Sequence, residues 1–514
     1  MARQKSENPI VSQGRRKASP TEPARGEKGV PVNEEMGQLG LPFATAESPR
    51  GSSRGRTGGR PPARSRRVPK ARVKSPMTLS ATMESVVECL DEALDHVARN
   101  KGAPGPNGRS VRAVRKDWPA TRRSLRRRLL DGSYQPGAIR RVEIPKPGGG
   151  VRGLGIPDVE DRVVQEALRL CLQPVFEPGF HTSSHGFRPK RSCHTAVAEA
   201  QRHVEAGHRV VVDLDLSKFF DRVNHQRLMA RVAREVPDRA LLVVLGRLLK
   251  ASVVLPDGVR VHVEEGVPQG GPLSPLLSNI VLDELDRELE RRGHRFVRYA
   301  DDVAIFVRSE RAGERVKQSV ARFIESRMRL VVNAEKSSVR RPGEGNFLGF
   351  RLGVLQDGTT EVRLSDRTMR RALTRLRELT PRTWGGSLAS CIARVNRYLQ
   401  GWFGFFGVCS PSARYELTKL DGRMRRRLRA IKLRQWKRKR TITRKLNRMK
   451  YSRKVARNVY QGRRSWWALS MDGVVNHRLN NRWFREQGLK SLLDRYAERE
   501  LARVVPAQQS FGWG

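Results

Sequence analysis

Cysteine is scarce in this chain, and long apolar runs are missing. The 514 residues include five cysteines, no two of which are spaced as Cys-x-x-Cys, so we expect reduced thiols in a cytosolic protein and no zinc finger. No apolar stretch approaches the roughly 18 residues that a membrane-spanning helix needs, and the polar N-terminus lacks the apolar centre of a signal peptide. The sequence therefore predicts a cytoplasmic protein that contacts no membrane.

Acidic residues are also in short supply. Lys and Arg total 102 against 52 Asp and Glu, which gives a formal net charge of +50. Self-repulsion at this charge destabilises a compact fold unless a polyanion neutralises it. Nucleic acid is the polyanion that we expect, because no amphipathic stretch suited to an anionic membrane accompanies the charge.

The composition changes along the chain and predicts its division. Residues 1–76 are rich in Gly, Pro, Ser and Arg without apolar periodicity, which predicts a disordered basic extension that either contacts RNA or only solubilises the protein. Beyond about Ser365 the pattern becomes helical, and residues 422–471 include no acidic residue. Basic side chains interleaved with an aromatic suit phosphate contact and base stacking, whereas a solvated helix face mixes both signs of charge.

Two adjacent aspartates stand at the centre of the clearest pattern. The β-forming residues on either side of Asp301 and Asp302 predict a hairpin with both carboxylates at its tip. An isolated Asp-Asp turn is usually solvated, but a second apolar strand, residues 209–212, also runs into acids, Asp213 and Asp215. Two strands that deliver carboxylates to one point form a site for hard divalent cations such as Mg²⁺. Two such ions support phosphoryl transfer by activating the attacking oxygen and stabilising the leaving one.

The sequence around these acids resembles the palm of a reverse transcriptase. The hairpin reads Tyr-Ala-Asp-Asp at 299–302. Two further blocks, His-Gly-Phe-Arg-Pro at 185–189 and Gly-Val-Pro-Gln-Gly-Gly-Pro-Leu-Ser-Pro-Leu-Leu at 266–277, are similar to those of group II intron-encoded reverse transcriptase/maturases. The resemblance runs in order from Lys101 to Leu492. It implies an RNA-directed DNA polymerase that also binds its group II intron RNA, in a ribonucleoprotein, and assists splicing and intron mobility.

The resemblance also implies an α+β fold, a right-hand polymerase. Residues 77–365 would form fingers and palm with an antiparallel sheet, residues 366–465 an α-helical thumb/maturase (X) domain, and residues 466–514 a basic and aromatic nucleic-acid-binding segment. Many relatives continue into a metal-binding endonuclease domain. Because no cysteine follows Cys409 before Gly514, we expect the compact bacterial type without that domain. The implied partners are the intron RNA, an RNA template, a DNA primer or target, and dNTPs, and no pattern indicates an oligomeric state.

The metal ligands follow from the same resemblance. Asp215 occupies the position of the family's strand-borne ligand, and Asp301 and Asp302 complete the catalytic set. Leu216 is placed beside them as a further metal ligand. The implied cofactor is a pair of Mg²⁺ ions, with Mn²⁺ as a substitute. Asp213 points to the same face of its strand as Asp215 and is either a reserve ligand or a supporting residue.

Four residues are candidates for nucleotide contact. Lys146 and Arg152 lie on either side of a Gly-rich turn and can close over a triphosphate, unless the turn is only a solvated basic hairpin. Phe220 would lie beneath the incoming sugar and exclude a ribose 2′-hydroxyl, with plain core packing as the alternative. Gln269 can hydrogen-bond a sugar or base edge from a turn whose two glycines let the backbone approach a ligand, or the turn simply enters the next helix.

Further candidates contact nucleic acid. The resemblance places Lys336 near phosphates. The acid-free stretch supplies the rest, namely Arg425, Arg426, Arg427, Trp436, Lys437, Arg438, Lys439 and Arg440. Two other functions stay open. A maturase that has lost polymerisation is disfavoured because the three aspartates and Gln269 are present, and a reverse transcriptase recruited to defence would share the chemistry but bind a different RNA.

Overall fold

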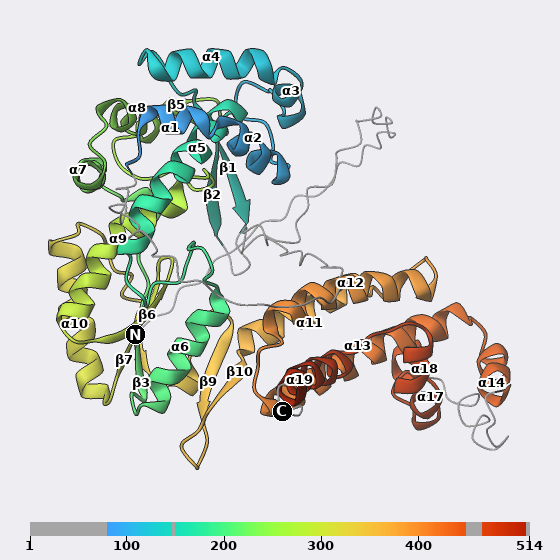
Figure 1. Ribbon diagram of the computed structural model, residues 1–514. Coiled ribbons are helices and arrows are strands. Elements are labelled where there is room, and N and C mark those ends of the chain that lie inside the picture. The colour runs from blue at the N-terminus through green and yellow to red at the C-terminus, as the bar shows by residue number, and fades with distance from the viewer. Residues whose placement is uncertain (1–79, 146–149, 449–464, 510–514) are drawn as a thin grey trace, which may run out of the picture. The chain divides into compact units, whose positions relative to one another are not determined.

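The computed structural model describes residues 80–145, 150–448 and 465–509, with side chains to residue 502 (Figure 1). The chain divides into two units, 1–72 and 73–514, and every described residue belongs to the second. The predicted basic extension and Lys146 therefore lie outside the described residues. Among the helices that are described, none is long and apolar enough to cross a membrane.

The first part of the described chain packs helices against a small sheet. Apolar side chains at helical spacing, from Leu90 to Val97, bury one face of α2, which packs along α5. The sheet has the strand order β2-β1-β4-β5, antiparallel except between β1 and β4. The helices are α1 Met83–Glu88, α2 Leu90–Arg99, α3 Val111–Lys116, α4 Trp118–Leu130, α5 Val159–Phe176, α7 His225–Glu235 and α8 Arg239–Leu249. The strands are β1 Ile139–Pro145, β2 Val151–Ile156, β4 Val253–Val254 and β5 Arg260–Val261.

A second sheet carries the predicted acidic hairpin. It is fully antiparallel, with the order β6-β7-β3-β8, so β3 lies between β7 and β8. The strands are β3 Val210–Leu214, β6 Arg295–Tyr299, β7 Asp302–Val307 and β8 Ser338–Arg340. The helices of this part are α6 Cys193–Glu205, α9 Ser274–Arg291 and α10 Glu310–Ser326. Strands β9 Phe350–Val354 and β10 Thr360–Leu364 follow as a separate hairpin.

Both faces of the second sheet are covered, which explains why β3 is apolar at almost every position. Val210, Val212 and Leu214 join one core, which also holds Val320 and Ile324 of α10. Val211 points the other way, into a second core that includes α6. A strand buried on two faces needs apolar residues in succession rather than in alternation. Asp213 lies within this strand, and Asp215 follows its last residue.

The last part of the described chain is helical and continues the second core. That core runs from α6 and the sheet through Phe350 and Leu364 into the C-terminal helices, as far as Tyr496. The helices are α11 Asp366–Leu379, α12 Leu388–Phe406, α13 Arg414–Gln435, α14 Lys439–Arg448, α16 Trp466–Leu469, α17 Gly473–Arg478, α18 Asn481–Glu486 and α19 Leu492–Gln509. Sheets followed by helices confirm the predicted α+β class.

Candidate active site

The acidic hairpin forms as the sequence predicts, with a tight turn between β6 and β7. Tyr299 pairs with Asp302, so Ala300 and Asp301 are the two turn residues. Ala300 has a φ of 56°, in the left-handed region that side chains with a Cβ seldom adopt. Tyr299 and Ala300 are buried, whereas Asp301 and Asp302 keep contact with solvent. The turn therefore holds its two carboxylates at an accessible end of the strands of a buried sheet. We call this end of the sheet the acidic edge.

Strand register brings the third predicted acid to the same edge. Strands β3 and β7 are antiparallel, with Leu214 opposite Val303, so the next step of this register sets Asp215 opposite Asp302. The backbone of Asp215 is held by Ser337, whose Oγ accepts its N–H at 3.1 Å, and by Asn333, whose N–H donates to its carbonyl at 2.8 Å. Asp215 therefore has a fixed backbone and a partly exposed carboxylate.

Desolvation, together with neighbouring negative charge, raises the pKa of both hairpin acids. Asp302 still presents surface to solvent, yet the protein around its carboxylate desolvates it, and this raises its pKa to about 7, with further contributions from Asp301, Asp215 and Asp213. The pKa of Asp301 is raised mainly by desolvation and then by Asp215, while Arg152 and Arg298 oppose the rise. These carboxylates thus lie within electrostatic reach of one another, as cation ligands must.

Asp213 is occupied by another partner. Its carboxylate pairs with the guanidinium of Arg340 on the neighbouring strand β8. Desolvation raises the pKa of Asp213 to about 6, against the effect of Arg340. Of the two roles that the sequence left open, this pairing favours the supporting one. Sequence reasoning missed Arg340, which is one of 102 basic residues and has no local pattern that marks it.

The carboxylates fit an open cation site rather than a closed cage. Among the described residues, no three His, Cys, Asp or Glu side chains form a group that could hold a metal ion by themselves. Mg²⁺ at phosphoryl-transfer sites takes one or two carboxylates and completes its shell with water and substrate phosphates, so this donor set suits it. Leucine has no side-chain donor and the side chain of Leu216 is buried, so its backbone carbonyl is the ligand that it can offer.

A cation stands beside the acids where phosphates are expected. The exposed ammonium of Lys336 lies 4.0 Å from Oδ2 of Asp215. Arg152, exposed on β2, lowers the pKa of Asp301 by its charge. Phe220 is partly buried, with its ring 5.2 Å from that of Phe219 in an edge-on contact. The structure thus brings Lys336 and Arg152 toward the acids, and it leaves part of the Phe220 ring exposed.

The glycines around Gln269 serve a contact within the protein. The carbonyl of Gln269 accepts the N–H of Gly155, on β2, at 2.7 Å. A Cβ on Gly270, whose φ is 117°, would lie 2.7 Å from the carbonyl oxygen of Gly155. The close backbone approach predicted for a ligand is therefore made to strand β2, and the side chain of Gln269 stays partly exposed.

The predicted nucleic-acid contacts divide into exposed and packed side chains. Lys437, Arg438 and Arg440 are exposed. The indole of Trp436 is only 7% exposed and belongs to the second core, so the prediction that it stacks on bases is not supported. Trp436 shares that core with Ile442 and Leu446 of α14.

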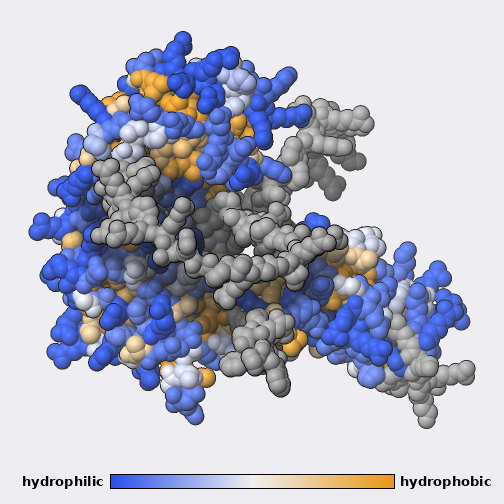
Figure 2. All heavy atoms as spheres, in the orientation of Figure 1, coloured by the Kyte–Doolittle hydropathy of each residue, from blue (hydrophilic) through white to orange (hydrophobic). Residues whose placement is uncertain are grey.

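The three consecutive arginines are half-buried and have partners inside the protein. Arg427 donates to the hydroxyl of Thr380 at 2.6 Å. Arg426 lies over the ring of Trp467, 3.9 Å from its centroid, and Arg382 contacts the same ring at 4.8 Å. The visible surface over α14, α17 and α18 is nevertheless largely hydrophilic (Figure 2).

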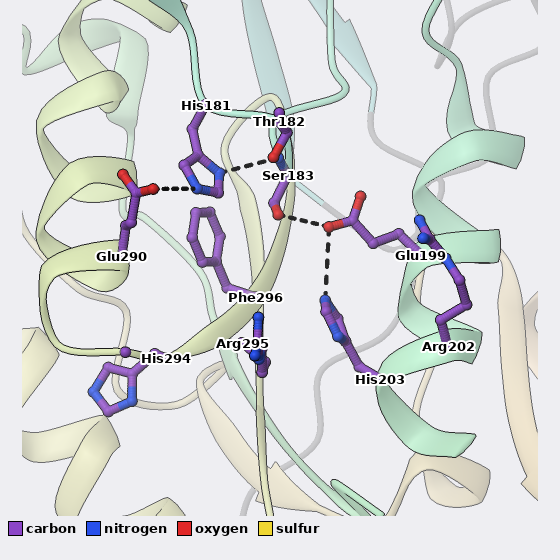
Figure 3. Close-up of a pocket in the computed structure, with 11 residues that line it drawn as sticks. His181, Thr182, Ser183, Glu199, Arg202, His203, Glu290, His294, Arg295 and Phe296 are labelled. Atoms are coloured by element: carbon purple, nitrogen blue, oxygen red, sulfur yellow. Dashed lines mark hydrogen bonds and ion pairs between the residues drawn. The ribbon is translucent and has the colours of Figure 1, made fainter. Parts of the chain in front are cut away.

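A cavity of about 530 Å³ lies on α6 and β6, away from the acidic edge (Figure 3). Its polar lining is engaged in internal contacts. Glu199 accepts a hydrogen bond from Ser183 at 2.6 Å and one from His185 at 2.8 Å, and His181 lies 3.6 Å from Glu290. His181 and His185 are thus engaged in contacts within the protein.

Comparison with known proteins identifies two family domains, one after the other along the chain. Residues 144–352 match the family described as Reverse transcriptase (RNA-dependent DNA polymerase), and residues 369–452 match Group II intron, maturase-specific domain. The first match holds every proposed palm and nucleotide residue named above. The second holds α13 and α14 with their basic side chains.

Three curated proteins illustrate the similarity. Protein YkfC of Escherichia coli (strain K12) is 34% identical over 306 residues, which cover 52% of this chain and 80% of that protein. Group II intron-encoded protein LtrA of Lactococcus lactis subsp. cremoris is 29% identical over 312 residues, 48% of this chain and 51% of LtrA. Retron Mx65 reverse transcriptase of Myxococcus xanthus is 36% identical over 210 residues, 39% of this chain and 47% of that enzyme.

The aligned region thus spans about half of LtrA and of the retron enzyme, and four fifths of YkfC. A reverse transcriptase domain that carries the acidic edge is followed by a maturase-specific domain made of helices, in the order that the sequence predicted. This chain belongs to the family of group II intron-encoded reverse transcriptase/maturases.

Proposed function

We propose that this protein synthesises DNA on an RNA template by extending a primer with dNTPs. The register of β3 and β7 carries the proposal, because its last pair, Leu214 opposite Val303, stands one residue before Asp215 and one residue after Asp302. Asp215, Asp301 and Asp302, with the carbonyl of Leu216, would hold two Mg²⁺ ions, or Mn²⁺ in their place. When bound, these ions activate the primer 3′-oxygen and stabilise charge on the α-phosphate.

Other side chains of the chain handle the nucleotide. Arg152 meets the triphosphate and offsets its charge, together with Lys146. Phe220 lies under the sugar and leaves no room for a 2′-hydroxyl. Gln269 donates to the sugar or base edge, and Lys336 contacts a phosphate near Asp215. The exposure of Arg152 and Lys336 beside the acids supports these roles.

The second proposed role is to hold the group II intron RNA and assist its splicing and mobility. The exposed side chains Lys437, Arg438 and Arg440 supply charge for phosphate contact, and Lys439 and Arg425 to Arg427 line the same helices. We propose that residues 77–365 act as fingers and palm, 366–465 as thumb, and 466–514 as a further nucleic-acid-binding segment. The working form is a cytoplasmic ribonucleoprotein that includes template and primer or target DNA.

Primer extension tests the polymerase proposal. Purified protein is given an RNA template, a DNA primer, dNTPs and Mg²⁺, beside Asp301→Asn/Asp302→Asn. The variant should lose DNA synthesis by at least about 100-fold, since metal ligands act together. Glu310→Gln/Glu314→Gln on α10 makes the same change in net charge at exposed positions and should synthesise normally. Wild-type protein that synthesises no DNA but binds intron RNA tightly would leave the alternative of a maturase without polymerisation.

The RNA that co-purifies with the protein tests the other alternative. The maturase-specific domain favours a long structured intron RNA as the partner. A different RNA, bound specifically, would instead favour a reverse transcriptase recruited to another task, such as defence.

A further inference from the structure

Arg298 is a fully buried cation in the strand that leads into the catalytic turn. It stands on β6, two residues before Ala300, and its side chain is 0% exposed. Its guanidinium donates to both carboxylate oxygens of Asp286, from Nε at 2.7 Å and from Nη2 at 2.5 Å. Asp286, on α9, is also 0% exposed. A buried bidentate pair of this kind fixes direction as well as charge.

The remaining arm of the guanidinium reaches the turn itself. Nη1 of Arg298 donates to the carbonyl oxygen of Ala300 at 3.0 Å and to Oδ1 of Asn279 at 2.9 Å. Asn279, also on α9 and buried, passes the contact on, because its Nδ2 donates to the carbonyl of Gly186 at 2.9 Å. The side chain of Arg298 therefore links helix α9 directly to the turn. Through the side-chain amide of Asn279 it is also linked to the loop at Gly186.

The loop before Gly186 lies against the same strand. The N–H of Arg298 donates to the carbonyl of Ser183 at 2.9 Å, and the N–H of His185 donates to the carbonyl of Arg298 at 2.8 Å. A Cβ on Gly186 would lie 2.2 Å from the nitrogen of Ala300, so this loop touches the turn backbone to backbone. On its far side the loop is held through Ser183 by Glu199 of α6 (Figure 3).

The turn needs such support. Ala300 adopts a left-handed conformation that is unfavourable for any residue with a Cβ. Asp301 and Asp302 follow it directly, and the negative charges around them repel one another. A strained turn that carries mutually repelling groups keeps its conformation only when the surrounding structure fixes it.

We propose that Arg298, held by Asp286 and Asn279, is a positioning residue for catalysis: it fixes the left-handed turn at Ala300 and so sets the place of Asp301 and Asp302. It contacts no substrate, and its role rests on the proposed polymerase function. The alternative role for the pair is charge neutralisation alone, in which Arg298 serves only to make Asp286 tolerable in the core.

Arg298→Lys separates these two roles. Lysine keeps the positive charge beside Asp286 but lacks the planar fork that reaches Asp286, Asn279 and Ala300 together. Arg298→Met/Asp286→Leu removes both charges and replaces them with apolar side chains, which buried ion pairs often tolerate. Leu289→Ala on the same helix removes fully buried packing without touching the turn and serves as a control for lowered stability.

Two readouts are compared at a temperature at which all the proteins are folded. Steady-state primer extension gives kcat and the KM for dNTP, and amide hydrogen exchange reports on residues 299–303 without any activity. Arg298→Lys and the double variant should each lose about 100-fold in kcat, as a misplaced reacting group does, with KM changed less than about threefold. Exchange at 299–303 should rise about tenfold in both. Leu289→Ala should match wild type in kcat and in exchange at the turn.

Either variant can overturn the proposal. Retention of kcat and of slow exchange in Arg298→Lys would show that charge neutralisation suffices. Should the double variant fail to fold, Asn279→Ala keeps the ion pair and removes the contacts of Asn279 with Arg298 and Gly186, with a smaller loss expected in the same direction. If wild-type protein makes no DNA, the polymerase proposal fails, while hydrogen exchange still decides whether Arg298 holds the turn.

Discussion

At the scale of single residues, the site combines groups that repel one another. Asp302 has a pKa of about 7 because its surroundings desolvate it and three other acids lie near. Such a carboxylate is poorly stabilised by the protein alone. A bound divalent cation offsets both the desolvation of the carboxylate and the repulsion between the acids. The same site can therefore destabilise the metal-free protein and stabilise the metal-bound one.

This arrangement predicts a pH-dependent stability of the metal-free protein. The pKa of Asp302 in the folded state lies above its ordinary value of 3.8, so the fold is favoured where Asp302 is protonated and loses stability as pH rises from about 4 to 7. Asp302→Asn removes this loss and should raise the unfolding free energy at pH 8 by roughly 1 kcal/mol, a figure discounted because the carboxylate retains solvent contact.

The check is chemical denaturation without divalent ions at pH 5 and pH 8, in which the gain from Asp302→Asn should grow with pH. Asp357, in an exposed turn, offers a control of opposite sign, because hydrogen bonds from Thr359 lower its pKa. Asp357→Asn should therefore be slightly unfavourable at pH 8. A gain from Asp302→Asn that is equal at both pH values would contradict the electrostatic explanation.

Phe220 supports a prediction about sugar selection. If its partly exposed ring fills the space of a 2′-hydroxyl, Phe220→Ala should raise ribonucleotide incorporation relative to deoxynucleotide by about tenfold or more, since the clash that rejects ribose is gone. Single-nucleotide extension with dNTP and rNTP measures the ratio, and Phe220→Tyr, which keeps the ring, should behave as wild type. An unchanged ratio in Phe220→Ala would mean that the ring only packs against Phe219.

At the scale of elements, the C-terminal helices are tied to α13 by buried polar groups. Asp421 of α13 is 0% exposed and accepts the N–H groups of Leu492 and Leu493, at 3.0 and 3.1 Å, where α19 begins. Arg429, also on α13, donates to the carbonyls of Ser470 and Leu479. These contacts join the segment after residue 465 to α13.

Asp421→Ala should therefore lower the unfolding free energy by about 1–3 kcal/mol, because two buried N–H groups lose their acceptor. Asp421→Asn keeps one acceptor oxygen and should lose less. Denaturation monitored by tryptophan fluorescence suits the comparison, since Trp466, Trp467 and Trp483 lie in the affected segment. An equal loss in both variants would mean that the charge, and not the acceptor, is what α19 requires.

Features within one element could be predicted from the sequence, whereas contacts between elements could not. The hairpin with Asp301 and Asp302 could be predicted because strand propensity and turn position are local. The burial of Trp436 could not, because it depends on a core that Ile442 and Leu446 of α14 also join. Arg298 escaped notice for the same reason: its partners Asp286 and Asn279 lie 12 and 19 residues away, on a different element. Only the tertiary structure brings Arg298 to these partners, and nothing in the sequence sets it apart from the other arginines.

At the scale of the whole molecule, the net positive charge decides how strongly RNA binding depends on salt. A formal net charge of +50 makes RNA binding depend strongly on released counterions. We expect the affinity for intron RNA to fall about 1000-fold or more between 50 and 200 mM salt. Lys437→Gln/Arg438→Gln/Arg440→Gln should reduce the slope of log Kd against log salt by about 2–3, because each phosphate that the protein no longer neutralises lowers the slope by about one.

The matched control is Arg311→Gln/Arg315→Gln/Arg322→Gln, which removes the same charge from exposed positions on α10. Its slope should change less, because long-range charge is screened at these salt concentrations. Equal slopes in the two triple variants would indicate that net charge, rather than direct binding by the segment after α13, governs the affinity.

We propose that one chain carries two separable activities, DNA synthesis at the acidic edge and intron RNA binding elsewhere. The most direct measurement takes one preparation of wild type and one of Asp301→Asn/Asp302→Asn, and assays each for primer extension and for the Kd of the intron RNA. We expect the variant to lose DNA synthesis by at least about 100-fold while its Kd stays within about twofold of wild type. Loss of both activities together, or synthesis that survives the double substitution, would contradict it.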